Sequence, residues 1–408
     1  MDIAQIVGRV DSERIYQHVL KLEGTRHAID TPEKLDEAAD YIRSEFKEHG
    51  LRVNDQEFKV ENFDAPFRNI EGVIGNGADS ELLIVSHYDT VRDCPGANDN
   101  GSAVAAMLEC ARVLAQEKDG HNVRFVSFTL EELNPARVLR TRKIAQSLGL
   151  TDGHHRYTTL RTQKFMRQLI KLQAKGSSAG KNPTEVISEL RHQLEDQMSE
   201  SEATYLRKME EMSKGITTTS WPGRTSLMGS SFWVEEAFRT RKKVSGVLCL
   251  ETIGYTSNKE HSQIIPEGMD PKMFQTYKVT DITVGNFLAI IGDANSGKLA
   301  QSFCAQSKLG SVDLPYACVQ IPLHYEEIAQ LGLHDLLRSD HAPFWREGIP
   351  GLLLTDTANF RYPFYHTQAD TVDKLDFDFI TKVCKATIAT AINLTNKRDD
   401  PQSFPKIP

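Results

Sequence analysis

Hydrophobic positions follow two alternating periods along most of the chain. Apolar or alternating runs predict strands at residues 51–60, 70–74, 82–85, 123–129, 244–250, 287–291, 317–321 and 351–354. Apolar positions at helical spacing predict helices at residues 11–22, 33–48, 103–115, 226–243 and 377–396, and another after Gly297. Strands that alternate with helices favour an α/β fold, with a mostly parallel mixed sheet covered by helices on both faces.

The alternation stops between about Pro135 and Ser220, where no strand pattern appears. Residues 159–174 have helical spacing, and a second helix is predicted to start at Asn182-Pro183-Thr184-Glu185 and to run toward Met212. The Gly/Ser-rich residues 175–181 would form the hinge between them. The prediction is a helical hairpin, residues 135–220, inserted into an α/β domain made of residues 1–134 and 221–408.

Charge divides the predicted insertion into two arms. Residues 135–181 carry eleven Lys or Arg and one acidic residue, Asp152, whereas residues 182–220 carry four basic and eight acidic residues. Opposite charges favour arms that pack together as a solvated lid or wall. A dimerisation element that makes a homo-oligomer and a lid that selects the substrate are the alternatives. The basic arm has few interleaved aromatic residues beyond Tyr157 and Phe165, so we expect no nucleic-acid partner.

The composition is that of an ordinary globular protein, with 408 residues, 39% hydrophobic, 25% charged and a net charge of −8. No apolar run has the length of a membrane span, and the first residues have neither a basic nor an apolar leader pattern. Most of the six cysteines lie in apolar runs, which indicates buried free thiols in a reducing compartment. We therefore expect a cytoplasmic protein with no membrane partner.

Polar residues with metal-binding side chains follow three of the predicted strands. His87 follows the strand at 82–85, the pair Glu131-Glu132 follows the next strand, and Glu251 ends the strand at 244–250. The carboxyl ends of parallel strands are where open α/β sheets bind ligands. With Asp99 from a Gly- and Asn-rich loop and His366 from a late segment, two imidazoles and three carboxylates could hold two divalent ions. The candidate metal ligands are His87, Asp99, Glu132, Glu251 and His366.

This combination of side chains suits zinc, with manganese or cobalt as alternatives. Two zinc ions would lower the pKa of a shared water to near neutrality, so that hydroxide is available at pH 7. Glu131 remains as a general base that accepts a proton from this water and delivers it to a leaving amine. Neighbouring strand residues point to opposite faces, which would separate Glu131 from Glu132. Asp89 lies two residues beyond His87 and could hold its imidazole in the ligating tautomer.

Six segments in order carry a resemblance to a known family: SHYDTV, PGANDNGSA, FTLEE, CLETIGY, SDHAPFW and YHTQADT. The chain resembles the di-zinc aminopeptidase family of metallopeptidases, whose relatives include glutamate carboxypeptidase and glutaminyl cyclase. The resemblance implies a zinc exopeptidase-like fold and covers nearly everything except the insertion.

The resemblance also implies a role for each residue of the site. His87 and Glu251 would bind one zinc, Glu132 and His366 the other, and Asp99 would bridge the two. Glu131 would be the base, Tyr365 would donate to the tetrahedral oxyanion, and Asp340 would support the ligands. The family usually has Asp where this chain has Glu251, and the extra methylene changes the reach of that ligand.

The expected function is a metal-dependent exopeptidase, an aminopeptidase that removes N-terminal residues from peptides with a free N-terminus. The first alternative is another amide reaction on the same scaffold: that of a carboxypeptidase, a deacylase or a mono-zinc glutaminyl cyclase. The second alternative is a binding protein that has kept the fold and lost the chemistry. Such a protein would lose ligands, whereas every ligand position here carries a metal-binding group.

Overall fold

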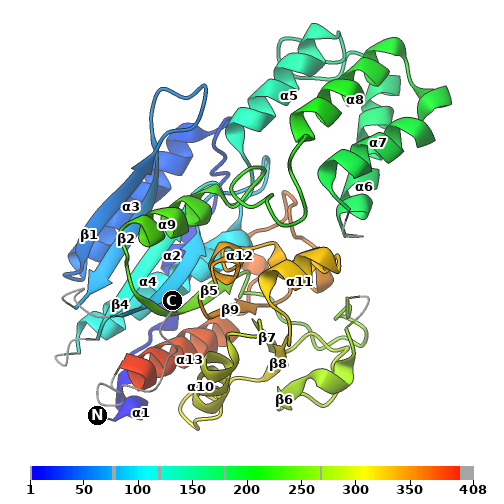
Figure 1. Ribbon diagram of the computed structural model, residues 1–408. Coiled ribbons are helices and arrows are strands. Elements are labelled where there is room, and N and C mark those ends of the chain that lie inside the picture. The colour runs from blue at the N-terminus through cyan, green and yellow to red at the C-terminus, as the bar shows by residue number, and fades with distance from the viewer. Residues whose placement is uncertain (1, 76–79, 118–120, 179–180, 267–268, 396–408) are drawn as a thin grey trace.

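A computed structural model describes residues 2–75, 80–117, 121–178, 181–266 and 269–395 (Figure 1). Its described strands form one nine-stranded sheet in the order β1-β2-β4-β3-β5-β9-β7-β8-β6. The strands are β1 (Arg52–Phe58), β2 (Phe67–Ile74), β3 (Glu81–His87), β4 (Val123–Phe128), β5 (Val244–Glu251), β6 (Gln275–Tyr277), β7 (Leu288–Gly292), β8 (Tyr316–Gln320) and β9 (Gly351–Thr355). The α-helices of the main body are α1 (Ile3–Val7), α2 (Ser12–Leu22), α3 (Pro32–Glu48), α4 (Ala103–Ala115), α9 (Met228–Arg239), α10 (Gly297–Ser307), α11 (Tyr325–Gln330), α12 (Ala342–Arg346) and α13 (Phe377–Thr395).

The centre of the sheet is parallel and its flanks are not. Strands β4, β3, β5 and β9 run in one direction, and β7 and β8 also pair in parallel. Pairs β1–β2, β2–β4, β7–β9 and β6–β8 are antiparallel, so half of the described pairings are antiparallel and the prediction of a mostly parallel sheet is wrong. Residues 59–66 between β1 and β2 are too few for a helical crossover, which forces antiparallel pairing there.

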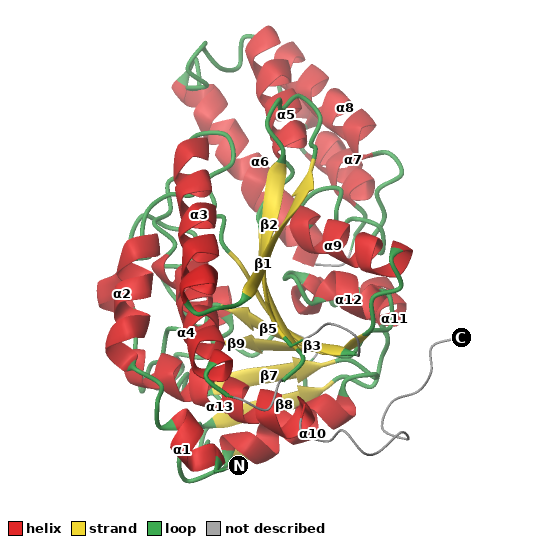
Figure 2. Cartoon of the chain, turned by 90° about the vertical axis from the view of Figure 1, so that its left-hand side faces the viewer, coloured by secondary structure: helices red, strands yellow, loops and turns green. Residues whose placement is uncertain are grey.

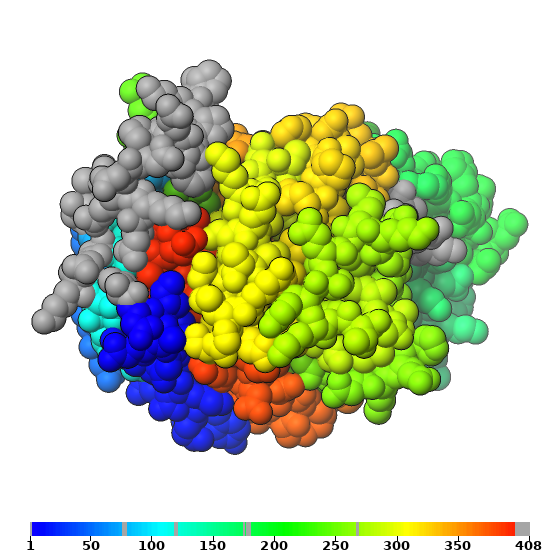
Figure 3. Space-filling model, turned by 90° about the horizontal axis from the view of Figure 1, so that it is seen from below, coloured from blue at the N-terminus to red at the C-terminus, as the bar shows by residue number. Residues whose placement is uncertain are grey.

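Helices cover both faces of the sheet, as the sequence predicts. On β3, Leu82 and Ile84 pack into the core that contains α4 and α13, because alternate strand residues face opposite sides. Leu83 and Val85 pack on the other side with Trp233 of α9 and other buried residues. Figure 2 shows the sheet between these layers, and Figure 3 shows the N-terminal part of the chain (blue) beside the end of α13 (red), consistent with the contact between α1 and α13.

Four helices lie between β4 and α9: α5 (Pro135–Ser147), α6 (Leu160–Ser178), α7 (Pro183–Gln193) and α8 (Glu200–Ser213). Figures 1 and 2 both show them as a helical lobe at one end of the molecule. The lobe has its own apolar core, which includes Leu169, Leu190 and Leu206. The division of the chain into a catalytic domain and an inserted subdomain thus agrees with the packing but stays a prediction.

The inserted segment is more elaborate than the hairpin that the sequence predicts. The helix expected from Asn182 toward Met212 is two helices, because Ser199 starts a new one: its backbone N–H donates to the Glu202 carboxylate at 2.7 Å. Helix α6 continues to Ser178, inside the predicted hinge, and residues 179–180 of that hinge lie outside the described residues. Asn396, the predicted end of the last helix, also lies outside them.

Hydrogen bonds connect the inserted segment with the main body. Arg142 of α5 donates two hydrogen bonds to the Asp30 carboxylate, at 2.8 and 2.7 Å, just before α3. After α8, the Thr219 carbonyl accepts from the Tyr325 hydroxyl of α11 at 2.8 Å. The inserted segment thus contacts the main body both at its first helix and after its last.

The six cysteines are buried and form no disulfide in the described structure, in agreement with the prediction of free thiols. Among the described helices, none is both long enough and apolar enough to span a membrane.

The separate core of the lobe predicts a local response to mutation. Leu206 on α8 is fully buried, and Leu206→Ala should lower the free energy of unfolding of the lobe by about 3 kcal/mol. Hydrogen exchange read by mass spectrometry should then accelerate in peptides from residues 135–213 and stay unchanged in the sheet. Leu160→Ala, at a position that is 85% exposed, is the control. Equal acceleration in the sheet would contradict a separately unfolding lobe.

Buried His18 on α2 predicts a loss of stability in acid. Burial, together with the charge of Arg14, lowers the pKa of His18 to about 4, and its Nδ1 lies 2.6 Å from the Tyr41 hydroxyl. Below pH ~6.5 the His18 imidazole takes up a proton in the unfolded chain but stays neutral in the folded protein. The free energy of unfolding therefore falls, by about 2 kcal/mol at pH 5.

The measurement is urea unfolding at pH 7.5 and pH 5 for the natural protein and for His18→Gln, which keeps a polar group without a titration. The substituted protein should lose less stability between the two pH values. An equal loss in both proteins would assign the acid sensitivity to other groups.

Candidate metal centre

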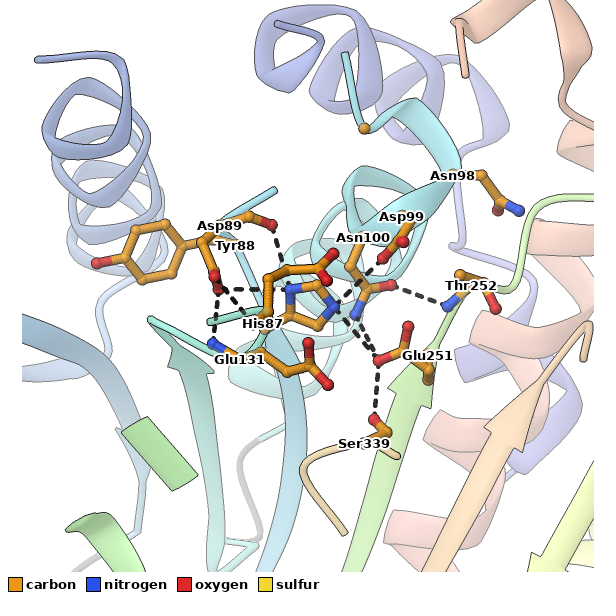
Figure 4. A network of polar contacts seen from close by, with 12 residues as sticks. His87, Tyr88, Asp89, Asn98, Asp99, Asn100, Glu131, Glu251, Thr252 and Ser339 are labelled. Carbon is orange, nitrogen blue, oxygen red and sulfur yellow. Dashed lines mark hydrogen bonds and ion pairs between the residues drawn. The ribbon is translucent and has the colours of Figure 1, made fainter. Parts of the chain in front are cut away.

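The parallel centre of the sheet delivers the predicted ligands to one edge. His87 is the last residue of β3 and Glu251 the last of β5, the strand beside it. Strand β4, on the other side of β3, ends at Phe128, and the chain continues to Glu131. Figure 4 shows the His87 imidazole between the side chains of Glu131, Asp99 and Glu251. Three strand ends that are neighbours in the sheet therefore supply one cluster.

Asp99 lies between the two histidines. Its Oδ1 is 3.4 Å from His87 Nε2, and its Oδ2 is 3.0 Å from His366 Nε2. His87 Nε2 is also 3.4 Å from Glu251 Oε2, and His366 Nε2 is 3.3 Å from Glu132 Oε2. The structure thus brings all five predicted ligands together, with one oxygen of Asp99 turned to each histidine.

These separations fit ligands that share a cation. Two atoms that are each about 2.05 Å from a tetrahedral zinc lie about 3.3 Å apart. Within the part of the chain that the structure describes, His87 Nε2 and Asp99 Oδ2 are buried without a hydrogen-bond partner. The ligand atoms of His87, Glu131 and Glu251 lie within 4.8 Å of one another, and so do those of His87, Asp99 and Glu132. The residues present therefore fit divalent cations.

The pKa shifts of the clustered side chains also indicate that positive charge would stabilise the cluster. Burial and the neighbouring carboxylates raise the pKa of Glu131 well above its usual value, while His87 opposes this shift. Burial likewise raises the pKa of Glu132. Burial lowers the pKa of His366, but the carboxylates of Glu132 and Asp99 outweigh it and raise that pKa to about 10. The cluster contains more carboxylates than imidazoles, so two protonated histidines would leave buried negative charge. Bound cations would neutralise this charge.

Asp89 connects the two neighbouring strand ends. Its carbonyl oxygen lies 3.2 Å from His87 Nδ1, which leaves Nε2 turned toward the other ligands. Its carboxylate oxygens accept from the backbone N–H groups of Glu131 and Glu132, at 3.0 and 3.2 Å. Asp89 therefore contacts the imidazole through its backbone carbonyl, and its carboxylate fixes the position of the acidic pair.

The side chains of Glu131 and Glu132 point to different groups, but strand alternation, the predicted reason, is not the cause. Strand β4 ends at Phe128, so the alternation of strand residues does not apply to Glu131 and Glu132. The chain turns at Leu130, whose φ of +57° is left-handed. After this turn Glu132 faces His366, and Glu131 lies with His87.

Tyr365, Ser339 and Asp340 complete the surroundings of the ligands. The Tyr365 ring stacks on the His366 imidazole, with centroids 3.8 Å apart, and Arg338 donates to its hydroxyl at 3.4 Å. The Ser339 hydroxyl donates to Glu251 Oε2 at 2.8 Å and so orients the longer side chain at that position. Asp340 is fully buried, which raises its pKa to about 7, and its charge adds to the upward shift of the Glu131 pKa.

Sequence reasoning missed the residues that position the loop around Asp99. The Asp370 carboxylate accepts from the backbone N–H groups of Asn98 and Asp99, at 2.8 and 3.1 Å. Arg26 is buried and donates to the carbonyls of Tyr88 and Gly96, at 2.7 and 3.0 Å. Asp370 stands in the segment YHTQADT and could have been found there, whereas nothing in the sequence around Arg26 marks its role.

A cavity of about 490 Å³ opens beside the ligands. Glu251, Ser339 and Tyr365 are among its lining residues, and strands β7, β8 and β9 also contribute to its lining. Most of the other lining side chains are apolar. The metal-binding cluster is thus continuous with a space large enough for part of a small organic molecule.

Comparison with known proteins shows what the chain is similar to. The uncharacterized protein YfbL of Escherichia coli K12 is 24% identical over 395 residues, which span 93% of this chain and 88% of that protein. The LapA aminopeptidase of Legionella pneumophila has the same fold, with a TM-score of 0.56 and 16% identity over 96% of this chain and 74% of that chain. A glutaminyl cyclase of Porphyromonas gingivalis, at 16% identity and a TM-score of 0.53, covers 94% of this chain and 99% of its own.

The family model described as Peptidase family M28 matches residues 69–286 and 290–391. The matched residues make up most of the chain and contain all five predicted ligands, Glu131 and Tyr365. They confirm the resemblance that the six motifs indicate. The chain belongs to Peptidase family M28 and is a metallopeptidase.

Proposed function

We propose that this metallopeptidase is an aminopeptidase that uses two zinc ions to hydrolyse the N-terminal residue from peptides. The observation that carries the proposal is the position of Asp99, which turns one carboxylate oxygen to His87 and the other to His366. A carboxylate in this position is suited to bridge two cations, and each histidine has a further carboxylate beside it. Manganese or cobalt could occupy the same oxygen and nitrogen ligands.

His87, Glu251 and Asp99 would hold one ion, and Glu132, His366 and Asp99 the other. When bound, the ions polarise the scissile carbonyl and lower the pKa of water. Ser339 supports this use of Glu251, because its hydroxyl holds the Glu251 carboxylate oxygen that lies near His87.

Glu131 would act as the general base, taking a proton from the attacking water and delivering it to the leaving amine. Its pKa is raised by burial, which makes its carboxylate a better proton acceptor than an exposed one. Asp89 would fix its backbone, and the Tyr365 hydroxyl would donate to the carbonyl oxygen as negative charge develops there. The substrate would have an unblocked N-terminus, with its α-amine near the metal-binding cluster.

Replacing the proposed base should separate chemistry from metal binding. Glu131→Gln keeps the shape of the side chain and removes its proton-accepting oxygen, so kcat for aminoacyl amides should fall by about 10³-fold. Zinc content, measured by elemental analysis, should stay at the natural level. Glu132→Gln is the matched variant one residue away and should lose zinc together with activity. Natural activity in Glu131→Gln would show that the base is another residue.

The number of bound ions tests the second zinc position. After removal of metal with a chelator and titration with zinc, the natural protein should bind two ions per chain. Glu251→Ala should bind only one ion tightly, because the other ion would keep only His87 and Asp99 as ligands from the protein. A single ion in the natural protein would favour a mono-zinc reaction such as that of a glutaminyl cyclase. Cleavage of acyl-blocked substrates instead of free aminoacyl ones would favour a deacylase.

A further inference from the structure

We propose that Asp356 is a positioning residue of the metal centre. Its buried carboxylate holds the chain segments of three ligands, Asp99, Glu251 and His366, at the spacing that two cations require. Asp356 directly follows β9 and is separate from the ligands themselves. The inference rests on the proposed two-ion centre, and it concerns how tightly this chain binds metal.

The carboxylate of Asp356 accepts hydrogen bonds from three places in the chain. Its Oδ2 accepts from the side-chain amide of Asn98 at 2.8 Å and from the backbone N–H of Tyr255 at 2.9 Å. Its Oδ1 accepts from the backbone N–H of Ala358 at 3.0 Å. Asp356 is fully buried, so these hydrogen bonds are shielded from bulk water and are strong. One side chain therefore connects the loop of Asp99, the segment after Glu251 and the loop that leads to His366.

Asn98 transmits the contact to the neighbouring ligand Asp99. Its side-chain amide donates to Asp356, and its side-chain oxygen accepts from the backbone N–H of Gly254 at 2.8 Å. Figure 4 shows Asn98 beside Asp99 on the same loop. Because both ends of the Asn98 side chain are engaged, its orientation is fixed, and so is the backbone from which Asp99 reaches the two histidines.

The segment after Glu251 is held at successive backbone N–H groups. Those of residues 252–254 donate to side chains of the Asp99 loop, at 2.9, 3.2 and 2.8 Å. The next N–H group, that of Tyr255, donates to Asp356. Unlike the other acceptors, Asp356 belongs to a different part of the chain, so it ties both segments to the end of β9.

The third connection leads toward His366. Ala358 begins the short helix η5 (Ala358–Phe360), and its φ of +45° is left-handed. A non-glycine residue in this region is strained and needs support from its surroundings. The hydrogen bond from the Ala358 N–H to Asp356 gives that support, so losing it would let the loop before His366 relax.

An ionised carboxylate is the group that suits these three donors. Burial raises the pKa of Asp356 to about 6, and the positive charge of Arg361 opposes this rise, so the carboxyl is ionised at pH 7.5. An amide of the same shape has one acceptor oxygen and one NH2 group, and the NH2 group would face an N–H donor. Asp356→Asn therefore breaks at least one of the connections without changing the volume of the side chain.

The test is calorimetric zinc titration of the full-length, chelator-treated protein at pH 7.5. Asp356→Asn should bind at least one of the two ions ~10- to 100-fold more weakly than the natural protein, as expected for a residue that orients ligands. Asp293→Asn is the matched control. Asp293 is also a fully buried carboxylate, but its side-chain partners Asn295 and Ser296 lie in its own turn. The zinc affinities of this control should stay within ~3-fold of the natural ones.

Natural zinc affinities in Asp356→Asn would overturn the inference, whatever happens to its melting temperature, because Asp356 would then serve stability alone. Equal weakening of zinc binding in Asp293→Asn would overturn it as well. If Asp356→Asn does not fold, Asn98→Ala removes one of the same hydrogen bonds from its other end and decides by the same comparison.

Hydrogen exchange of the full-length protein before zinc is added separates this inference from the proposed function. If the natural protein binds a single ion, the two-ion proposal fails, and the exchange of the metal-free protein then judges Asp356 alone. Faster exchange in peptides that contain Asn98 and Tyr255, seen in Asp356→Asn and not in Asp293→Asn, supports the positioning role. Natural exchange of these peptides in Asp356→Asn would reject it.

Discussion

A buried surplus of negative charge at the carboxyl edge of the parallel strands is the constraint on which the site depends. Asp99, Glu132 and Glu251 lie 3.0–3.4 Å from two imidazole nitrogens, and Glu131 stands beside them. Carboxylates in such a place would repel one another or take up protons unless cations neutralise them. Bound metal ions would therefore offset the cost of bringing these groups together.

The fold meets this constraint with a layer of hydrogen bonds around the ligands. Asp89 holds the strand end that carries His87 and the turn that carries the acidic pair, while Asp370 holds the backbone of Asp99. Ser339 orients Glu251 from a segment that follows β8. Asp99, Glu251 and the backbone of the acidic pair are thus held by residues from other parts of the chain, which keeps these groups in place although they bring like charges together.

Part of this organisation could be predicted from the sequence. The buried strands that carry His87 and Glu251 end where their apolar runs end, so both ligands were assigned to strand ends correctly. Strand direction on the flanks could not be predicted, because alternation of apolar residues is the same in parallel and antiparallel pairs. Strand β6 was not predicted, because it is only three residues long and partly exposed.

The supporting residues were harder to predict than the ligands. Asp370 contacts a backbone 271 residues earlier in the chain, and Arg26 acts through carbonyl groups that carry no sequence signal. In the helical lobe, the Ser199–Glu202 cap that begins α8 is visible in the sequence. The apolar spacing nevertheless continues across the break after Gln193, so a single helix was predicted. The differences between the predicted and the observed structure therefore come from long-range contacts and from helix caps that compete with apolar periodicity.

The paired-cation centre is tested most directly by crystals of the zinc-loaded protein measured at the zinc absorption edge. Two anomalous peaks are predicted, one bounded by His87, Asp99 and Glu251 and the other by Asp99, Glu132 and His366. The absence of a peak between His87 and Glu251, or of any peak beside Asp99, would contradict the arrangement.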